Sequence, residues 1–207
     1  MAAGDPMIIA QVAQSLVNHL HERGLDPRPL LATQHLDLEG PDAFDARVPL
    51  RSYVRLFEQA AAATGDPALG LHLSAEVGPE VLGALGFLFL SSASLGEALG
   101  NLARYTAAIQ DATEMKIVAA DGLAQVSYQI RHDAIAPRAQ DAEFSLACTY
   151  RLMRSYVGPR LRVAEAHFEH SPISPLKTYE AVFRCPVYFR QATNALVLDE
   201  ADLRIAS

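Results

Sequence analysis

Tryptophan is absent from this sequence of 207 residues, and cysteine occurs only at Cys148 and Cys185. Two thiols without further ligands make neither a disulfide framework nor a zinc site, and they fit a reducing compartment. No basic segment followed by a long apolar run stands near Met1, which argues against a signal peptide. We therefore expect a cytoplasmic protein.

Long apolar runs are absent as well. The longest, at residues 81–90, is about half of the roughly twenty residues that a membrane helix needs, so we expect no membrane contact. Positive charge is scarce, because lysine occurs only at Lys116 and Lys177 and the formal net charge is -7. An acidic chain has no general attraction to the phosphate backbone of nucleic acids. Half of the residues are hydrophobic, which is enough to bury a sizeable core.

The first half of the chain has helical periodicity. Apolar residues recur three and four positions apart over residues 7–23 and again over residues 50–63. Ser94 and Glu97 form an S-x-x-E capping box, which predicts that another helix begins there. Helices are therefore expected to fill most of residues 1–112.

Residues 81–91 are apolar nearly all round, which predicts a central, buried helix. Gly83 and Gly86 would permit a close approach of backbones there.

The period changes to that of β-strands after residue 112. Residues 114–119 and 123–131 alternate in character and are joined by Asp121-Gly122, a strong signal for a hairpin. The elements expected next are a helix over 138–157, a strand over 161–170, a short helix to Phe183, and a second hairpin formed by 187–190 and 195–199.

This order of elements predicts the α+β class. We expect a helix-rich N-terminal half (about 1–112), followed by a sheet-containing part (about 113–207) with an antiparallel sheet of about five strands covered by helices. Because no internal repeat or low-complexity segment interrupts the sequence, we expect a single domain over residues 1–207.

Signatures of common enzyme classes are missing. The sequence has no G-x-S-x-G elbow, no phosphate-binding G-x-x-x-x-G-K-[ST] loop and no H-E-x-x-H pair. His167 and His170 lie three apart on a predicted strand, so their rings face opposite sides and cannot share a metal ion. We expect no catalysis, no metal and no cofactor. The alternative is a small hydrolase or transferase with Glu143 or His167 as its acid or base.

Polar residues on predicted apolar faces indicate a candidate pocket. Glu143 shares a helical face with Leu146 and Tyr150, where a carboxylate needs a partner. Tyr105 and Tyr128 lie on the core-facing sides of their elements and carry hydroxyls that need partners. A few polar groups that converge in an aliphatic surround are typical of a small-molecule pocket. The alternatives are a structural bridge for Glu143 and ordinary core packing for the tyrosines.

The pocket is expected where the helices that begin near Ser94 and Arg138 meet the strand that begins at Leu123. A solvent-facing position at a sheet edge is the alternative for His167. The residues that we expect to bind a ligand are Glu143, Tyr105, Tyr128, Phe87, Tyr150 and His167.

Three segments together resemble a known family. They are Leu50-Arg-Ser-Tyr-Val-Arg-Leu-Phe-Glu58, the run from Gly86 to Tyr105, and His167-Phe-Glu-His-Ser-Pro172 followed by Cys185-Pro-Val-Tyr-Phe189. Their order and spacing resemble the N-terminal effector domains of AraC/XylS-type transcription regulators, often labelled arabinose-binding-like. The resemblance covers about residues 8–205.

The resemblance implies a bacterial sensor that binds a small-molecule effector of unknown identity and forms a homodimer. Full-length members carry a further segment with two helix-turn-helix units, and this sequence stops at Ser207, where that segment would be approaching. DNA binding is therefore expected only through a C-terminal domain that this chain lacks. The alternative is a dimerisation or interaction module with no small-molecule ligand. Because the family has no fixed ligand motif, no ligand residue is carried over.

Overall fold

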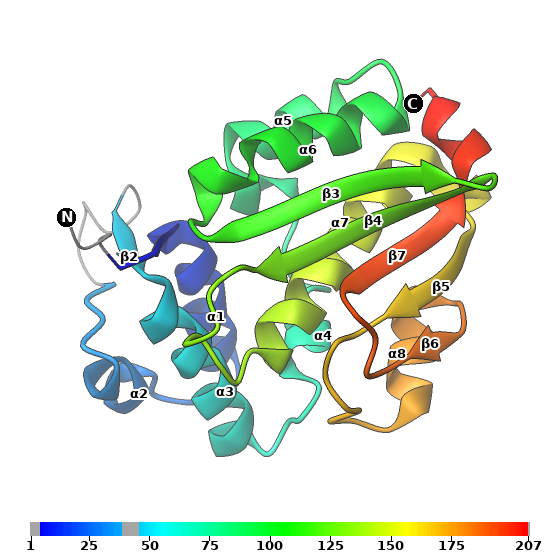
Figure 1. Ribbon diagram of the computed structural model, residues 1–207. Coiled ribbons are helices and arrows are strands. Elements are labelled where there is room, and N and C mark those ends of the chain that lie inside the picture. Colours follow the sequence, from blue (N-terminus) through cyan, green and yellow to red (C-terminus); the bar gives the residue numbers. More distant parts are fainter. Residues whose placement is uncertain (1–4, 39–45, 207) are drawn as a thin grey trace.

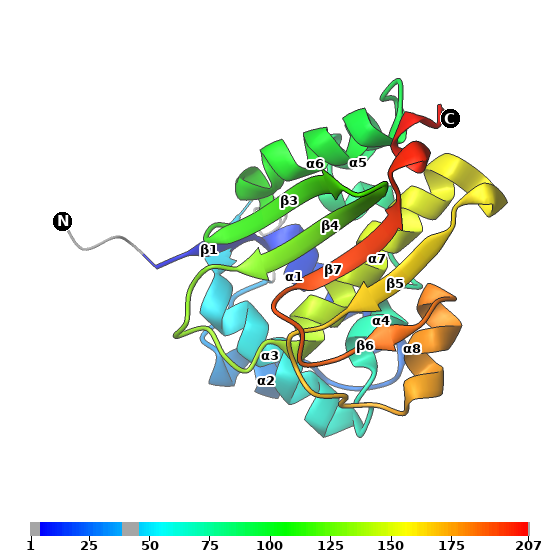
Figure 2. The same cartoon turned by 45° about the vertical axis from the view of Figure 1, so that its right-hand side comes forward.

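The structure is a computed structural model that describes residues 5–38 and 46–206. Its sheet has five strands in the order β3-β4-β7-β5-β6. The helices lie behind this sheet in Figures 1 and 2, so one face is covered and the other is open. The strands are β3 (Thr113–Ala120), β4 (Leu123–Ile130), β5 (Val163–His167), β6 (Val187–Tyr188) and β7 (Asn194–Asp199).

The α+β class is confirmed, and the five-stranded sheet is formed from residue 113 onward. A separate two-stranded sheet joins β1 (Met7–Ile9) to β2 (Arg47–Pro49). The α-helices are α1 (Ala10–Glu22), α2 (Arg28–Thr33), α3 (Leu50–Thr64), α4 (Leu69–Leu73), α5 (Ala84–Leu90), α6 (Leu95–Ile109), α7 (Ala139–Val157) and α8 (Leu176–Phe183). Three 3₁₀ helices are η1 (Pro79–Leu82), η2 (Gly158–Arg160) and η3 (Glu200–Arg204).

The Asp121-Gly122 hairpin is confirmed. β3 and β4 pair antiparallel, with Ala120 opposite Leu123. Asp121 and Gly122 have φ values of 55° and 79°. Positive φ at both central positions is what a two-residue type I′ turn requires, and Asp and Gly adopt it readily.

The second predicted hairpin is wrong. β7 pairs with β4 on one side and with β5 on the other, so β5 lies between β7 and β6. β6 pairs with β5 in parallel, which makes the sheet mixed rather than purely antiparallel. The reason is burial: five of the six residues of β7 are buried, as suits an interior strand, while the two-residue β6 is left at the edge.

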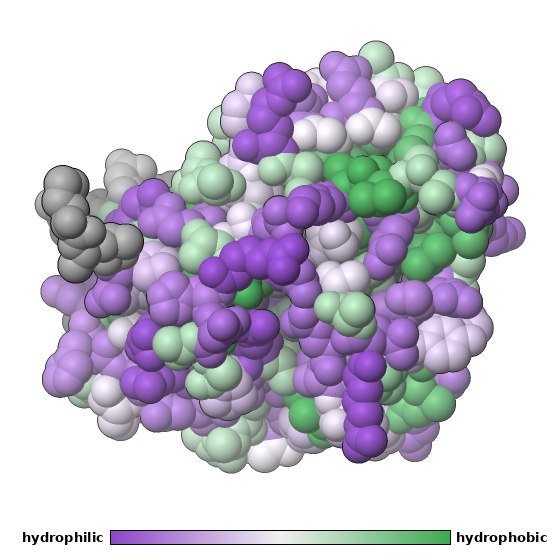
Figure 3. All heavy atoms as spheres, viewed as in Figure 1, coloured by the Kyte–Doolittle hydropathy of each residue, from purple (hydrophilic) through white to green (hydrophobic). Residues whose placement is uncertain are grey.

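The open face of the sheet is largely hydrophilic. Burial alternates along β4, where Ala124, Val126, Tyr128 and Ile130 are buried against the helices. Figure 3 shows mostly hydrophilic side chains over the opposite face.

Helix α7 runs through the middle of the molecule. It packs against α3, α4, α5, α6 and α8, and also against β4 and β7. Its first turn is fixed by Gln140, whose Oε1 accepts a hydrogen bond from the Gly70 backbone at 2.8 Å and whose Nε2 donates to the Pro67 carbonyl at 2.8 Å. Because α7 meets both the helices and the sheet, its side chains line the spaces between the two layers.

Residues 81–91 do not form one buried helix, contrary to the expectation. Gly83, with φ 56° and ψ -134°, separates η1 from α5, and Phe87 is 66% exposed on α5. Because the segment has no polar residue before Ser91, its sequence does not indicate which side faces water, and it suggested burial all round. The expected close approach is confirmed at Gly86, where an added Cβ would lie 1.9 Å from the Pro79 carbonyl oxygen.

The Ser94 cap leads to a prediction about stability. Ser94 Oγ accepts a hydrogen bond from the Glu97 backbone at 3.2 Å, and Glu97 Oε2 accepts one from the Ala93 backbone at 2.8 Å. Ser94→Ala removes the first of these bonds, and we expect it to lower the free energy of unfolding by about 1 kcal/mol in urea titrations followed by circular dichroism. Ser155→Ala, at an exposed position on α7, is the matched control and should cause no loss. Equal stability of the two variants would show that the cap contributes nothing.

Candidate functional site

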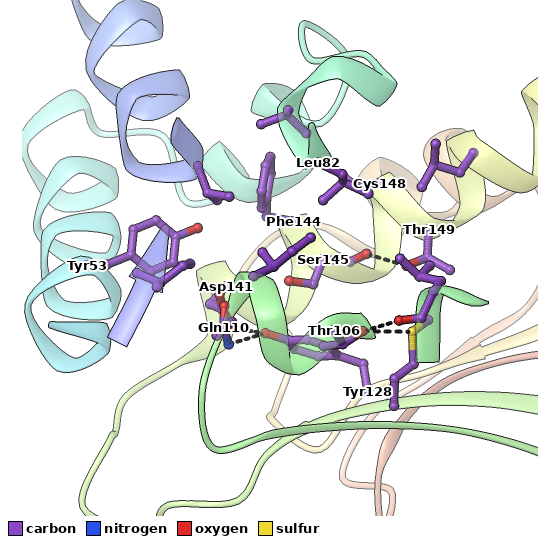
Figure 4. Close-up of a pocket in the computed structure, with 17 residues that line it drawn as sticks. Tyr53, Leu82, Thr106, Gln110, Tyr128, Asp141, Phe144, Ser145, Cys148 and Thr149 are labelled. Carbon is purple, nitrogen blue, oxygen red and sulfur yellow. Dashed lines mark hydrogen bonds between the residues drawn. The ribbon is translucent and has the colours of Figure 1, made fainter. Parts of the chain in front are cut away.

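A cavity of about 80 Å³ lies between the helices and the sheet, at the junction of α6, α7 and β4 (Figure 4). This is the junction at which the sequence led us to expect a pocket. Most of its wall is apolar and includes Leu102 of α6 and Leu152 of α7. Val81 and Leu82 of η1 close it on one side, which places the irregular segment before Gly83 directly over the cavity.

One end of the cavity is polar. Tyr128 donates a hydrogen bond from its hydroxyl to Asp141 Oδ2 at 2.7 Å and accepts one from Gln110 Nε2 at 2.8 Å. Gln110 Nε2 also donates to Thr113 Oγ1 at 2.7 Å. Asp141 and Gln110 lie together at this end in Figure 4, with Tyr53 beside them. Strand β4, the end of α6 and the first turn of α7 thus bring one connected polar group to the cavity wall.

Asp141 is 1% exposed. Burial raises the pKa of its carboxyl to about 7, opposed by the hydrogen bond from Tyr128 and reinforced by the negative charge of Glu58. Within residues 5–38 and 46–206, no Arg, Lys or His forms an ion pair with it. A carboxyl in this state takes up or releases a proton near neutral pH, or pairs with a cation that enters the cavity.

Tyr53 of α3 lines the same end and is 1% exposed. Its ring packs on Phe57 at a centroid distance of 5.8 Å, and its hydroxyl has no hydrogen-bond partner in the described part of the chain. Burial raises the pKa of Tyr53 well above its usual value, and the nearby Asp141 raises it further. A hydroxyl without a partner at a cavity wall is available to a ligand.

Cys148 and Thr149 of α7 lie at the other end of the cavity (Figure 4). Burial raises the pKa of the Cys148 thiol to about 12. Because the thiolate is the reactive form, this cysteine is not an activated nucleophile. Among the described residues, no group of three or more His, Cys, Asp and Glu side chains is placed to hold a metal ion.

Of the residues expected from the sequence, Tyr128 lines the cavity. Tyr105 is 44% exposed, so the expectation that it faces the core is wrong. The buried side of α6 runs through Leu102 and Thr106, and Tyr105 is turned by about 100° from Thr106 on the helix. Phe87 points to solvent on α5 and does not line the cavity.

Glu143 is fully buried but lies away from the cavity, beside α8. Its Oε1 accepts a hydrogen bond from the Tyr179 hydroxyl at 2.6 Å, and its Oε2 has no partner among the described residues. His170 Nε2 is 3.7 Å from Oε1. Burial raises the pKa of Glu143 to about 8 and lowers that of His170, so neither group carries a full charge at neutral pH. Glu143 therefore bridges α7 to the neighbouring helix α8, which matches the structural alternative for this residue.

Tyr150 and His167 lie outside the cavity as well. Tyr150 packs edge-on against Phe183 of α8, with ring centroids 5.8 Å apart. His167 Nε2 is 2.7 Å from Glu165 Oε2 on the same strand. Glu143, Tyr105 and Tyr128 do not converge either, because only Tyr128 lines the cavity.

Asp141, Tyr53 and Gln110 were missed in the sequence. Asp141 stands two residues before Glu143, which turns it by about 200° to the opposite side of α7. The available signal was the spacing of Asp141, Ser145, Cys148 and Leu152, which repeats at helical intervals and lines the cavity along one stripe.

Comparison with known proteins gives one matching family model, described as the arabinose-binding domain of AraC transcription regulator, N-terminal, over residues 24–206. The chain is 28% identical over 179 residues to an ornithine utilization regulator from Pseudomonas aeruginosa, covering 86% of this chain and 53% of that protein. It is 26% identical over 172 residues to the HTH-type transcriptional regulator VirS from Mycobacterium tuberculosis, covering 82% and 51%. The chain thus spans about half the length of these relatives.

The crystal structure of the transcriptional regulator CdpR from Pseudomonas aeruginosa has the same fold. The TM-score is 0.63 at 20% identity, and the match covers 87% of this chain and 55% of that one. In the described part of the chain, no helix has the length and apolar character needed to cross a membrane. The matched relatives are transcription regulators and not enzymes. The chain belongs to the family of N-terminal arabinose-binding domains of AraC transcription regulators.

Proposed function

We propose that this domain senses a small-molecule effector in the cavity between α6, α7 and β4, and that it forms a homodimer in the cytoplasm. The observation that carries the proposal is the polar end of that cavity, where Asp141, Tyr128 and Tyr53 meet a wall that is otherwise mainly apolar. A few fixed polar groups in an apolar surround are the usual construction of a small-molecule site. Of the residues expected from the sequence, this proposal keeps Tyr128 and leaves out Glu143, Tyr105, Phe87, Tyr150 and His167.

Exposed apolar side chains support dimerisation. Phe87 and Leu88 on α5 and Tyr105 on α6 are 66%, 38% and 44% exposed. Large apolar side chains exposed to solvent can mark a contact with another chain, and α5 and α6, which carry these three, pack against each other. DNA binding is proposed for a separate part of the full-length regulator, since the net charge of -7 does not suit a phosphate backbone.

The small volume of the cavity supports a second candidate function. A volume of about 80 Å³ is well below the range of roughly 300 Å³ and above that is usual for ligand sites. An effector therefore has to be small, or has to displace η1, whose Val81 and Leu82 cover the cavity. An interaction module with no small-molecule ligand is the alternative that this small volume favours.

A thermal-shift screen over amines, amino acids, fatty acids and aromatic acids separates the two functions. An effector at a hundred times its Kd should stabilise the folded domain by about 2.7 kcal/mol and raise its Tm. Thr149→Leu adds bulk at the cavity wall and should abolish the shift, whereas Ser155→Leu, at an exposed position of the same helix, should retain it. A dimer in sedimentation experiments whose Tm responds to no compound would favour the interaction module.

A further inference from the structure

We propose that the effector carries a primary amine on a small apolar body, and that Asp141 is the counter-ion of its ammonium group. This inference rests on the proposed function, because it concerns the same cavity. It narrows the effector from any small molecule to one chemical class.

The polar end of the cavity is negative, and no Arg, Lys or His of residues 5–38 and 46–206 lines it. Asp141 accepts a hydrogen bond from Tyr128 but forms no ion pair among the described residues, and Glu58 of α3 is close enough to act on it as a second negative charge. Arg138, the cation that acts on Asp141, lies 3.6 Å from Glu169 and pairs with that residue instead. An entering cation would complete this end of the cavity, whereas an entering carboxylate would be repelled.

The hydrogen-bonding groups suit a donor. The Asp141 carboxylate accepts bonds, and the Tyr53 hydroxyl at the same end has no partner within the described residues. An ammonium group has three N–H donors and no acceptor, so it can donate to both. The hydroxyl of Tyr128 is already engaged, because it donates to Asp141 and accepts from Gln110. It therefore holds the carboxylate in place.

The rest of the wall selects for an apolar body. Leu102, Leu152, Val81 and Leu82 line much of the space beyond the polar end. Thr106 and Thr149 also line the cavity, but their hydroxyls already donate to backbone carbonyls of their own helices. Among the described residues, no Arg, Lys or His lines the cavity, so a zwitterion would find no partner there for its carboxylate. A polyol would leave most of its hydroxyls unpaired against these side chains. An amine attached to a short hydrocarbon suits the negative charge of the polar end, its hydrogen-bond acceptors and the apolar wall.

Three probes of one shape test the inference: 3-methylbutylamine, 3-methylbutan-1-ol and 3-methylbutanoate. We expect the amine to raise the Tm and, in calorimetric titration, to bind at least about tenfold more tightly than the alcohol, since hydrogen bonds to charged groups are the stronger ones. The carboxylate should not bind. Asp141→Asn keeps an acceptor for Tyr128 but loses the charge. In this variant the ratio of the affinity for the amine to that for the alcohol should fall to about one.

Glu143→Gln is the matched control, because it removes a buried carboxyl of the same helix that does not line the cavity. It should keep the full preference for the amine. Tyr53→Phe should weaken amine binding several-fold, and it provides a second reading if Asp141→Asn does not fold. Equal binding of alcohol and amine to the wild type, or an undiminished preference in Asp141→Asn, would overturn the inference. If the amine does not bind but another class of compound does, this inference is wrong and the proposed function stands. If no class of compound in the wider screen binds, the proposed function is wrong too.

Discussion

Glu143→Gln should make the unfolding free energy of the domain less dependent on pH and should make the domain more stable than the wild type near pH 8. In the folded protein, burial raises the pKa of Glu143 to about 8 from an ordinary value of 4.5. The folded state therefore holds a proton that the unfolded state releases. The stability from this group is complete below pH 4.5 and is lost as the pH rises through about 8, at up to about 1.4 kcal/mol per pH unit.

The most informative interval is pH 6.5 to 8, which includes little of the range in which Asp141 and His170 make stability depend on pH. The lowered pKa of His170 affects stability mainly below this interval, and Asp141, with a pKa of about 7, mainly in its lower part. In urea titrations over this interval, we expect the unfolding free energy of the wild type to fall by about 2 kcal/mol through Glu143. The unfolding free energy of Glu143→Gln should not show this fall. The amide retains an oxygen that can accept the hydrogen bond from Tyr179.

Glu180→Gln is the control for this comparison, because Glu180 is exposed on α8. Its pH profile should follow that of the wild type. If Glu143→Gln also follows the wild-type profile, then burial does not raise the pKa of Glu143 in the folded protein.

Gly86→Ala should destabilise the domain by about 3 kcal/mol or more, because the new methyl group has no room. Its Cβ would lie 1.9 Å from the Pro79 oxygen and 2.6 Å from the Pro79 carbonyl carbon. Both atoms are backbone, so a rotamer change cannot relieve the clash. Helices η1 and α5 would have to separate, and with them Val81 and Leu82, which cover the cavity.

Gly100→Ala is the matched substitution on α6. Nothing lies within 4 Å of an added Cβ at this exposed position. Because alanine favours a helix over glycine, this variant should gain about 0.5–1 kcal/mol. Urea titrations followed by circular dichroism measure both variants. Wild-type stability in Gly86→Ala would mean that η1 moves away from α5 at little cost.

The features that could be predicted from the sequence depend on local chemistry. Asp121-Gly122 specifies its own turn, and Ser94 with Glu97 specifies the beginning of a helix. Glu143 could be found because a carboxylate on an apolar stripe is anomalous wherever the helix packs. Each of these signals lies within a few residues of chain.

The site could not be predicted in the same way. Asp141 lies in the first turn of α7, where an acidic residue is ordinary because it suits the helix dipole, so nothing indicated its burial. Tyr53 belongs to the apolar side of α3 and looked like core. Their meeting depends on how α3 and α7 pack, over a separation of about ninety residues. The order of β6 and β7 was missed for the same reason.

The central position of α7 has a consequence for how the chain folds as it is synthesised. Helices α3 and α4 pack against α7, which follows them by many residues. At 5–20 residues per second, they wait on the order of ten seconds on the ribosome before α7 emerges to cover them. During that time the apolar sides of the early helices have only one another for cover. A nascent chain that stalls before Ala139 is thus a natural client for chaperones that bind exposed apolar segments.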